Sequence, residues 1–338
     1  MTVDLGALST PFDRIGTGEA AAIARACYGL DGRLHRLDTE KDDTFRLDTP
    51  EGRFILKIAN PGEGVGELDL QVSALRHLQA RAPDLPVPRV LPDLAGDYLP
   101  VVAGNRRARL MTFLPGAVMD TVTPLPEERR QIGRLLARLR HALADFRHPE
   151  ACRTLVWDVR HLPSLVPLLN YVPPRHKTAL AEGILRFAEL MPRIDALPRQ
   201  ILHNDFSRSN LLVARPGGVT GIIDFGDVVE TAIAVDVSTA LLNQLPRDAA
   251  ARPVNDLFAE ARDVLTGYQE IARLSREELS LIPHLVMGRI VTRALLSLWR
   301  AASFPDNAAY ILRNTEQGWA QLDWFLARDP AAVSELLL

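Results

Sequence analysis

The stretch that decides the fold reads Leu202-His-Asn-Asp-Phe-Ser-Arg-Ser-Asn-Leu-Leu-Val213, followed after a short turn by Gly221-Ile-Ile-Asp-Phe-Gly-Asp-Val228. Its two aliphatic runs, 211–213 and 221–223, flank a Gly-containing turn, which is the signal of a β-hairpin. Polar residues lie just before the first predicted strand and just after the second. The hairpin therefore predicts that two polar clusters, separated in sequence, meet at one end of a small sheet.

The residue types in these clusters suit phosphoryl transfer. That reaction needs Mg²⁺ on the phosphate oxygens and a carboxylate that orients the attacking hydroxyl and accepts its proton. We expect Asp205 to be this base, while Asn210 and Asp224 offer the hard oxygen ligands that Mg²⁺ prefers. The spacing His-x-Asp-x-x-x-x-Asn, followed by Asp-Phe-Gly, is the kinase pairing of a catalytic loop with a metal loop. The alternative is a surface loop with solvated acids.

On these residues the chain resembles the aminoglycoside phosphotransferase and choline kinase-like small-molecule kinases, from about residue 15 to 330. It looks closest to the hydroxylysine kinase-like branch, and the cues are Phe45-Arg46-Leu47, Leu56-Lys57-Ile58-Ala59-Asn60, Leu68-Asp69-Leu70-Gln71 and Ile223-Asp224-Phe225-Gly226-Asp227. The resemblance implies an α+β, two-lobed protein kinase-like fold. A small antiparallel-sheet lobe over residues 1–113 would bind the nucleotide, and a larger, mainly helical lobe over 114–338 would carry catalysis and substrate binding.

Composition limits the classes of protein that fit. The chain has 338 residues, of which 47% are hydrophobic and 24% charged, so a packed core is expected. The net charge is −3 without a block of Lys or Arg, which argues against nucleic-acid or anionic-lipid partners. Two cysteines are too few for a disulfide framework or a zinc site. With no visible signal peptide and no apolar run near the roughly 20 residues that span a bilayer, we expect a cytoplasmic protein that binds small molecules and no membrane.

The N-terminal region predicts a helix over 18–28 and strands over 33–37, 44–48 and 53–59. The third strand contains Lys57 in a mostly apolar run, and a buried lysine needs a partner. In a kinase lobe that partner is the nucleotide phosphate; the alternative is an edge-strand lysine facing water. The loop between the first two strands has no glycine-rich pattern, and its role stays open. It carries four acidic residues, Asp38, Glu40, Asp42 and Asp43.

A predicted helix over 67–80 follows. Kinases usually place a glutamate on this helix to pair with the strand lysine, and the resemblance puts that position on Gln71. A glutamine can orient Lys57 but cannot neutralise it, so Glu67, one turn away, is the alternative partner. Strands are also predicted over 99–103 and 107–113. Backbone groups of Thr112, Phe113 and Leu114 are expected to bind the purine edge, unless this stretch is only a linker between lobes.

The remaining chain predicts helices, among them a long one from a capping box at Ser275 and Glu278 to about residue 302. Pro283 is expected to kink or restart that helix. By the resemblance, His203 packs on the metal-loop backbone, and Asp236 is a buried structural aspartate that holds the catalytic loop.

The expected activity is transfer of the γ-phosphate of ATP or GTP, with Mg²⁺, to a hydroxyl of an amine or amino-acid metabolite such as hydroxylysine; the resemblance hints at GTP. A substrate ammonium suits Asp227 and Asp158, a carboxylate suits Arg293, and Trp299 could stack or form a cation–π contact. The alternatives are a helix cap or solvated acid for Asp158, an exposed side chain for Arg293 and core packing for Trp299.

Other function classes remain as alternatives. They are a nucleotide-binding pseudokinase scaffold, an aminoglycoside-type antibiotic phosphotransferase and a metal-dependent hydrolase, although the last would need more histidine ligands. A protein kinase is disfavoured, because Asn204 stands where an arginine is common and the chain has no Ala-Pro-Glu. Only eight residues separate Asp227 from Asp236, which leaves little room for an activation segment.

Overall fold

The computed structural model describes residues 13–39, 42–251, 253–312 and 315–338. The N-terminal lobe is an antiparallel six-stranded sheet in the order β1-β2-β3-β6-β4, with β5 pairing β6. Its elements are α1 (Thr17–Tyr28), β1 (Arg33–Leu37), β2 (Asp43–Thr49), β3 (Gly52–Ile58), α2 (Val65–Arg81), β4 (Val90–Leu91), β5 (Val101–Val102) and β6 (Arg106–Thr112). The expected helix and first three strands are confirmed, whereas the strand predicted over 99–103 is only two residues long.

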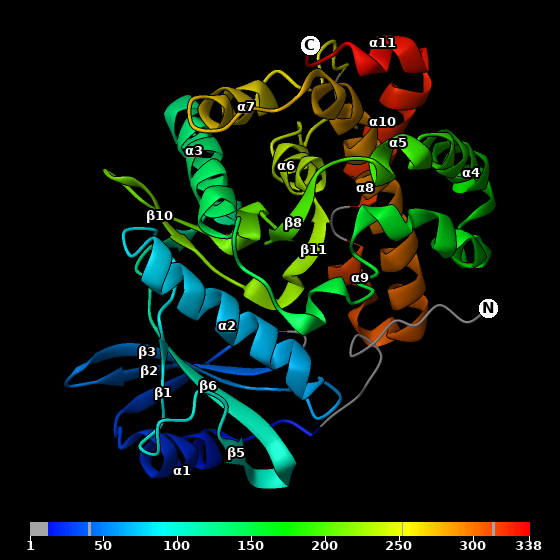
Figure 1. Ribbon diagram of the computed structural model, residues 1–338. Coiled ribbons are helices and arrows are strands. Elements are labelled where there is room, and N and C mark those ends of the chain that lie inside the picture. Colours follow the sequence, from blue (N-terminus) through cyan, green and yellow to red (C-terminus); the bar gives the residue numbers. More distant parts are fainter. Residues whose placement is uncertain (1–12, 40–41, 252, 313–314) are drawn as a thin grey trace.

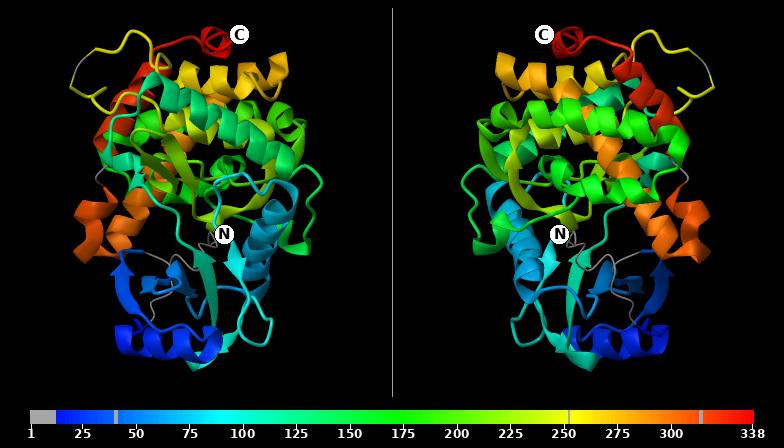
Figure 2. Two further views of the ribbon diagram at one scale, coloured as in Figure 1. Left: turned by 90° about the vertical axis from the view of Figure 1, so that its left-hand side faces the viewer. Right: turned by 90° about the vertical axis from the view of Figure 1, so that its right-hand side faces the viewer.

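The C-terminal lobe is mainly helical and packs against one end of the sheet lobe (Figures 1 and 2). Its α-helices are α3 (Pro126–Ala142), α4 (Pro174–Glu189), α5 (Met191–Asp195), α6 (Ile233–Leu242), α7 (Ala261–Gln269), α8 (Arg276–Ser303), α9 (Ala308–Ile311), α10 (Thr315–Leu326) and α11 (Pro330–Ser334). The 3₁₀ segments among the described residues are η2 (Ala103–Asn105), η3 (Met119–Thr121), η4 (Pro149–Cys152), η5 (Val159–Tyr171), η6 (Arg208–Asn210), η7 (Phe225–Asp227) and η8 (Pro305–Asn307). The expected two-lobed α+β fold is therefore confirmed.

Two faces of the small sheet pack against different partners. One face buries Phe45, Leu47 and Leu56 against α1, and each of these side chains is at most 1% exposed. Burying a side chain of this size contributes about 1.5–3 kcal/mol, so α1 is held firmly on the sheet. Because side chains alternate along a strand, Lys57 points to the opposite face from Leu56. That face looks toward α2 and the helical lobe (Figure 1).

The hairpin predicted from the sequence is present as β9 (Leu211–Ala214) and β10 (Gly218–Ile222), paired antiparallel, with β7 (Ala117–Val118) on the other side of β9. A second small sheet pairs β8 (Arg199–Leu202) with β11 (Val229–Ala232). Since β8 leads into the first polar cluster and β11 leaves the second, this pairing and the hairpin bring the two loops side by side.

The long helix α8 begins at the expected capping box, in which the Glu278 N–H donates to Ser275 Oγ at 3.1 Å and the Ser275 N–H donates to Glu278 Oε2 at 2.8 Å. It continues through Pro283 as one helix and does not restart there. By length and composition α8 passes as a membrane span, contrary to the expectation from the sequence, but 89% of its apolar window is buried inside the protein. The helix thus forms part of the core of the large lobe.

Candidate active site

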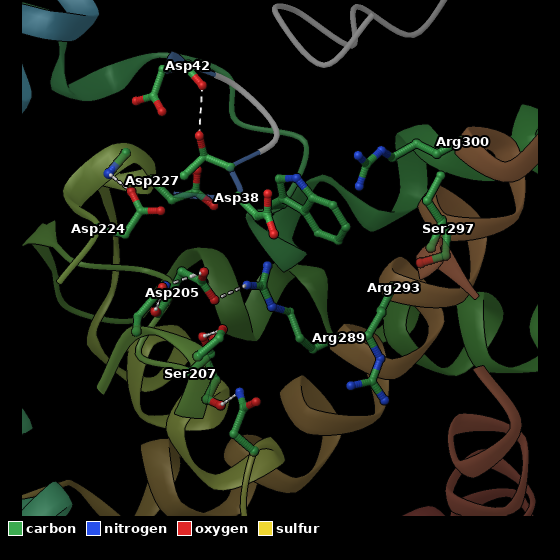
Figure 3. A pocket seen from close by; sticks show the side chains of 18 of the residues that line it. Asp38, Asp42, Asp205, Ser207, Asp224, Asp227, Arg289, Arg293, Ser297 and Arg300 are labelled. Carbon is green, nitrogen blue, oxygen red and sulfur yellow. Dashed lines mark hydrogen bonds and ion pairs between the residues drawn. The ribbon is translucent and has the colours of Figure 1, made fainter. Parts of the chain in front are cut away.

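A cavity of about 480 Å³ opens between the two lobes, lined by β3, α2, the loops that follow β8 and β10, and α8. Figure 3 shows its interior. Seven residues singled out from the sequence line it together: Lys57, Gln71, Asp205, Asn210, Asp224, Asp227 and Arg293. The hairpin therefore positions both polar clusters at one cavity, and β3 adds the lysine.

Hydrogen bonds fix both Asp205 and the loop after β8 that carries it. Asn210 Nδ2 donates to Asp205 Oδ2 at 2.7 Å and to the Asp205 carbonyl at 3.0 Å. The backbone N–H of Asn204, which has a left-handed φ of 62°, donates to Asp236 Oδ1 at 2.8 Å. Asp236 is buried, and burial raises its pKa to about 6. The expected role of Asp236 as a buried anchor of this loop is confirmed.

The loop after β10 is also strained and locally supported. Asp224 has φ 62° and ψ 80°, and its side chain accepts from the Gly226 N–H at 3.2 Å. A non-glycine residue in this region persists only where its surroundings impose it, which is common at functional sites. His203 supports this loop by two contacts. Its Nε2 donates to the Ile223 carbonyl at 3.2 Å, and its ring packs edge-on against the Phe225 ring with 4.8 Å between the ring centres. The expected structural role of His203 is confirmed.

The carboxylate nearest to Lys57 comes from the acidic loop before β2. Lys57 Nζ lies 3.4 Å from Asp42 Oδ2 and 4.0 Å from Asp224 Oδ1. Asp42 also accepts from Thr44 Oγ1 at 2.7 Å and lies 3.5 Å from Arg109 Nη2. Burial alone would raise the pKa of Asp42, but the charges of Lys57 and Arg109 and the Thr44 hydrogen bond outweigh it and lower that pKa. Asp42 is therefore an ionised, buried partner of the lysine.

This arrangement corrects the expectation that α2 supplies the partner of Lys57. Gln71 lines the cavity, but its Nε2 donates to Glu63 Oε1 at 3.0 Å. Glu67 pairs with Arg153 instead, with 3.4 Å between Glu67 Oε1 and Arg153 Nη1. Asp42, from a loop for which the sequence predicted no role, therefore supplies the carboxylate that the glutamine on α2 cannot supply.

The stretch expected at the purine edge lies at the end of β6. The N–H of Thr112 donates to the Arg89 carbonyl at 2.9 Å, and the N–H of Phe113 donates to the Arg53 carbonyl at 3.1 Å. The guanidinium of Arg53 also stacks 4.6 Å from the centre of the Phe113 ring. Thr112, Phe113 and Leu114 are not among the described residues that line the cavity.

Two further predicted substrate residues lie elsewhere among the described residues. Asp158 is fully buried, accepts from the Arg160 N–H at 3.0 Å and pairs with Arg160 Nη2 at 2.7 Å, so it caps η5. Trp299 is half-buried and packs against the hydrophobic core. The tryptophan that does line the cavity is Trp157, whose ring centre lies 5.9 Å from the guanidinium carbon of Arg289.

One face of α8 forms the wall opposite the acids. Arg289 is buried, with its Nη2 3.3 Å from the Asn204 carbonyl and 3.9 Å from Asp205 Oδ1. Arg293, Ser297 and Arg300 continue along the same wall. Of these residues, only Arg293 was expected in the site from the sequence. Spacings of four, four and three residues are the signal that could have found the others, because they place side chains on one helix face.

Comparison with known proteins gives consistent results. The model of the phosphotransferase enzyme family matches residues 31–274. Hydroxylysine kinase of Danio rerio is 24% identical over 332 residues, covering 91% of this chain and 91% of the relative. A solved microcompartment-associated aminopropanol kinase superposes with a TM-score of 0.73 at 20% identity, covering 91% and 97% of the two chains. An amicoumacin kinase solved in complex with AMP-PNP, Ca²⁺ and Ami gives a TM-score of 0.68 at 18% identity, covering 90% and 94% of the two chains.

Proposed function

Because the chain belongs to the phosphotransferase enzyme family, we propose that it transfers the γ-phosphate of ATP or GTP to a hydroxyl of a small amine or amino-acid metabolite of the hydroxylysine type. One observation supports this most directly: Lys57, Asp205, Asn210 and Asp224 surround a single cavity between the lobes. Residues up to 113 form the nucleotide-binding lobe in this proposal, and residues from 114 form the catalytic lobe.

Asp205 is the proposed general base. A carboxylate that accepts the proton of the attacking hydroxyl must be fixed within hydrogen-bond reach of it, and Asn210 fixes Asp205 at 2.7 Å. The guanidinium of Arg289 lies 3.9 Å from Asp205 Oδ1 on the side of α8. The hydroxyl of the acceptor then lies on the cavity side of Asp205, between the metal loop and α8.

Asn210 and Asp224 are the proposed Mg²⁺ ligands. Both line the cavity and both offer hard oxygen donors, which fits an ion that takes one or two protein carboxylates together with substrate phosphates. When bound, Mg²⁺ supplies charge neutralisation on the phosphate oxygens. Lys57 would contact the same phosphates, Gln71 would border them, and the backbone of Thr112, Phe113 and Leu114 would meet the purine.

The decisive experiment is an acceptor screen with purified protein, Mg²⁺ and either ATP or GTP, in which acceptor-dependent release of ADP or GDP is measured. Hydroxylysine and other hydroxylated amines and amino acids are the acceptors. We expect turnover with at least one of them and none with Asp205→Asn under the same conditions. Binding of nucleotide without acceptor-dependent release across the screen would refute the kinase proposal and favour a nucleotide-binding scaffold.

A further inference from the structure

The cavity is divided by charge. Figure 3 shows Asp42, Asp205, Asp224 and Asp227 on one side and Arg293 and Arg300 on the other, with Arg289 reaching toward Asp205 between them. The acids come from the two loops at the hairpin and from the loop before β2, whereas the three arginines all come from α8. We call these three residues the α8 arginine face.

The arginine face has a regular spacing. Its members lie four and seven residues apart, with Ser297 between the last two, so all of them project from one side of the helix. At about 1.5 Å of rise per residue, Arg293 lies roughly 6 Å along the helix from Arg289. Since Arg289 is close to Asp205, Arg293 lies about one helical turn beyond the proposed site of proton transfer.

Arg293 lacks an anionic partner among the described residues. Its Nη2 is buried without a hydrogen-bond acceptor, and the same is true of Arg289 Nη1. Burial, together with the nearby charges of Arg289 and Arg247, lowers the pKa of Arg293 to about 10. A guanidinium nitrogen that is buried without an acceptor is costly, and Arg293 lines a cavity of ligand size. This arrangement suits the binding of an anionic ligand at Arg293.

We infer that the α8 arginine face binds a carboxylate of the acceptor, with Arg293 as the main contact and Arg289 beside it, so that the acceptor is a hydroxy amino acid rather than a bare amino alcohol. The inference rests on the proposed kinase function and names its substrate class. A hydroxyl at Asp205 and a carboxylate one helical turn away suit a short chain. The acceptor ammonium would then face the acidic side, where Asp227 lies.

Two other ligands could be considered for the α8 arginine face: the nucleotide phosphates and a polycationic antibiotic. The first belongs on the other side of the cavity, and the second has the wrong charge. Nucleotide phosphates belong near Lys57 and Asp224, which are on the acidic side of the cavity. A polycationic antibiotic would be repelled by three guanidinium groups. An arginine fork, by contrast, matches a carboxylate in shape and charge and holds it with two hydrogen bonds.

The test compares acceptors that differ only in the carboxylate, by isothermal calorimetry on the full chain. One pair is hydroxylysine and its decarboxylated form 1,5-diaminopentan-2-ol; the other is homoserine and 3-aminopropan-1-ol. At least one amino acid should bind more tightly than its partner by roughly 10- to 100-fold, which is the value of a charge-assisted hydrogen bond. In Arg293→Gln this preference should vanish, and in Arg293→Lys it should survive in part, because the charge remains.

The matched control is Arg276→Gln, which removes an exposed arginine from the N-terminal end of the same helix and should leave the preference unchanged. Equal affinity within both pairs, no binding of either amino acid, or an unchanged preference in Arg293→Gln would each overturn the inference. A fall in nucleotide affinity in Arg293→Gln without a change in acceptor affinity would overturn it too, by placing Arg293 on the donor.

Turnover separates this inference from the proposed function. If the enzyme is a kinase, Arg293→Gln should raise KM for the amino acid while KM for the nucleotide stays constant. If the amino acid binds in an Arg293-dependent way but no phosphoryl transfer occurs, the inferred carboxylate site stands and the kinase proposal is refuted.

Discussion

Replacing Asp42 by asparagine tests the buried charge cluster at Lys57. The substitution keeps the size of the side chain and an oxygen that can still accept from Thr44 Oγ1, but it removes the negative charge. The side chains of Lys57 and Arg109 are only 16% and 6% exposed, and they approach the same oxygen of Asp42 at 3.4 and 3.5 Å. Two largely buried cations would therefore lose the carboxylate they share.

Removing one partner from a buried ion pair costs about 3–5 kcal/mol, because the remaining charge is left desolvated. Lys57 keeps a second carboxylate at 4.0 Å, that of Asp224, whose side chain is 53% exposed. This partial compensation places the expected loss near the lower limit, at about 3 kcal/mol in the free energy of unfolding. The loss should shrink when Mg²⁺ and nucleotide are saturating, because the phosphates then offer Lys57 another anion.

Urea unfolding of the nucleotide-free protein, followed by circular dichroism, measures this quantity. Asp31→Asn is the control, because Asp31 pairs with Arg25 at 3.2 Å while both side chains are well exposed, at 78% and 61%. An exposed pair is worth at most about 1 kcal/mol. If Asp42→Asn costs no more than Asp31→Asn, Asp42 is not the partner that holds Lys57, and the reasoning fails.

Four further outcomes are expected. Asp205→Asn should lower kcat by roughly 10²–10⁴-fold in single-turnover assays and leave nucleotide affinity unchanged. Asp224→Ala should abolish Mg²⁺-dependent nucleotide binding in calorimetry, because the one charged ligand proposed for the metal is lost. Gln71→Ala and Glu67→Ala should each change nucleotide affinity less than Lys57→Ala does, since their side chains bond to Glu63 and Arg153. Burial and the charges of Arg193 and Arg186 lower the pKa of His284 to about 4. The unfolded chain, with a histidine pKa of about 6.5, binds this proton first, so stability should fall as pH drops from 6.5 toward 4; urea titrations of His284→Gln should show a flatter dependence there.

The grouping of the proposed catalytic and metal-binding residues was predictable because its information is local. Asp205 and Asn210 are five residues apart, and Asp224 follows the predicted hairpin directly, so one loop and one turn suffice to bring them together. The supporting role of His203 is of the same kind, because its partner at Ile223 lies across that hairpin. Spacing and residue type therefore carried this part of the prediction.

The partner of Lys57 was not predictable in the same way. Asp42 reaches the lysine because β2 and β3 pair with Thr44 opposite Lys57, and because Arg109, 67 residues away in sequence on β6, lies beside it. The neighbouring Asp43 likewise pairs with a buried arginine far away in sequence, Arg106, at a separation of 63 residues. Alternating patterns predict that strands exist but not which charged residues of different strands meet. The role of the acidic loop stayed open because this tertiary neutralisation is invisible in the sequence.

The charge cluster has a consequence for how the cavity meets a nucleotide. In the absence of ligand, Lys57 and Arg109 share the carboxylate of Asp42, and Asp224 and Asp227 add further negative charge to the same side. A free nucleoside triphosphate would therefore meet net repulsion on the side where Lys57 lies. Mg²⁺ changes this balance, because it carries two positive charges to hard oxygen ligands at Asp224 and Asn210. Nucleotide and metal should thus bind as one unit, and Arg293, on the α8 wall, stays available for the acceptor.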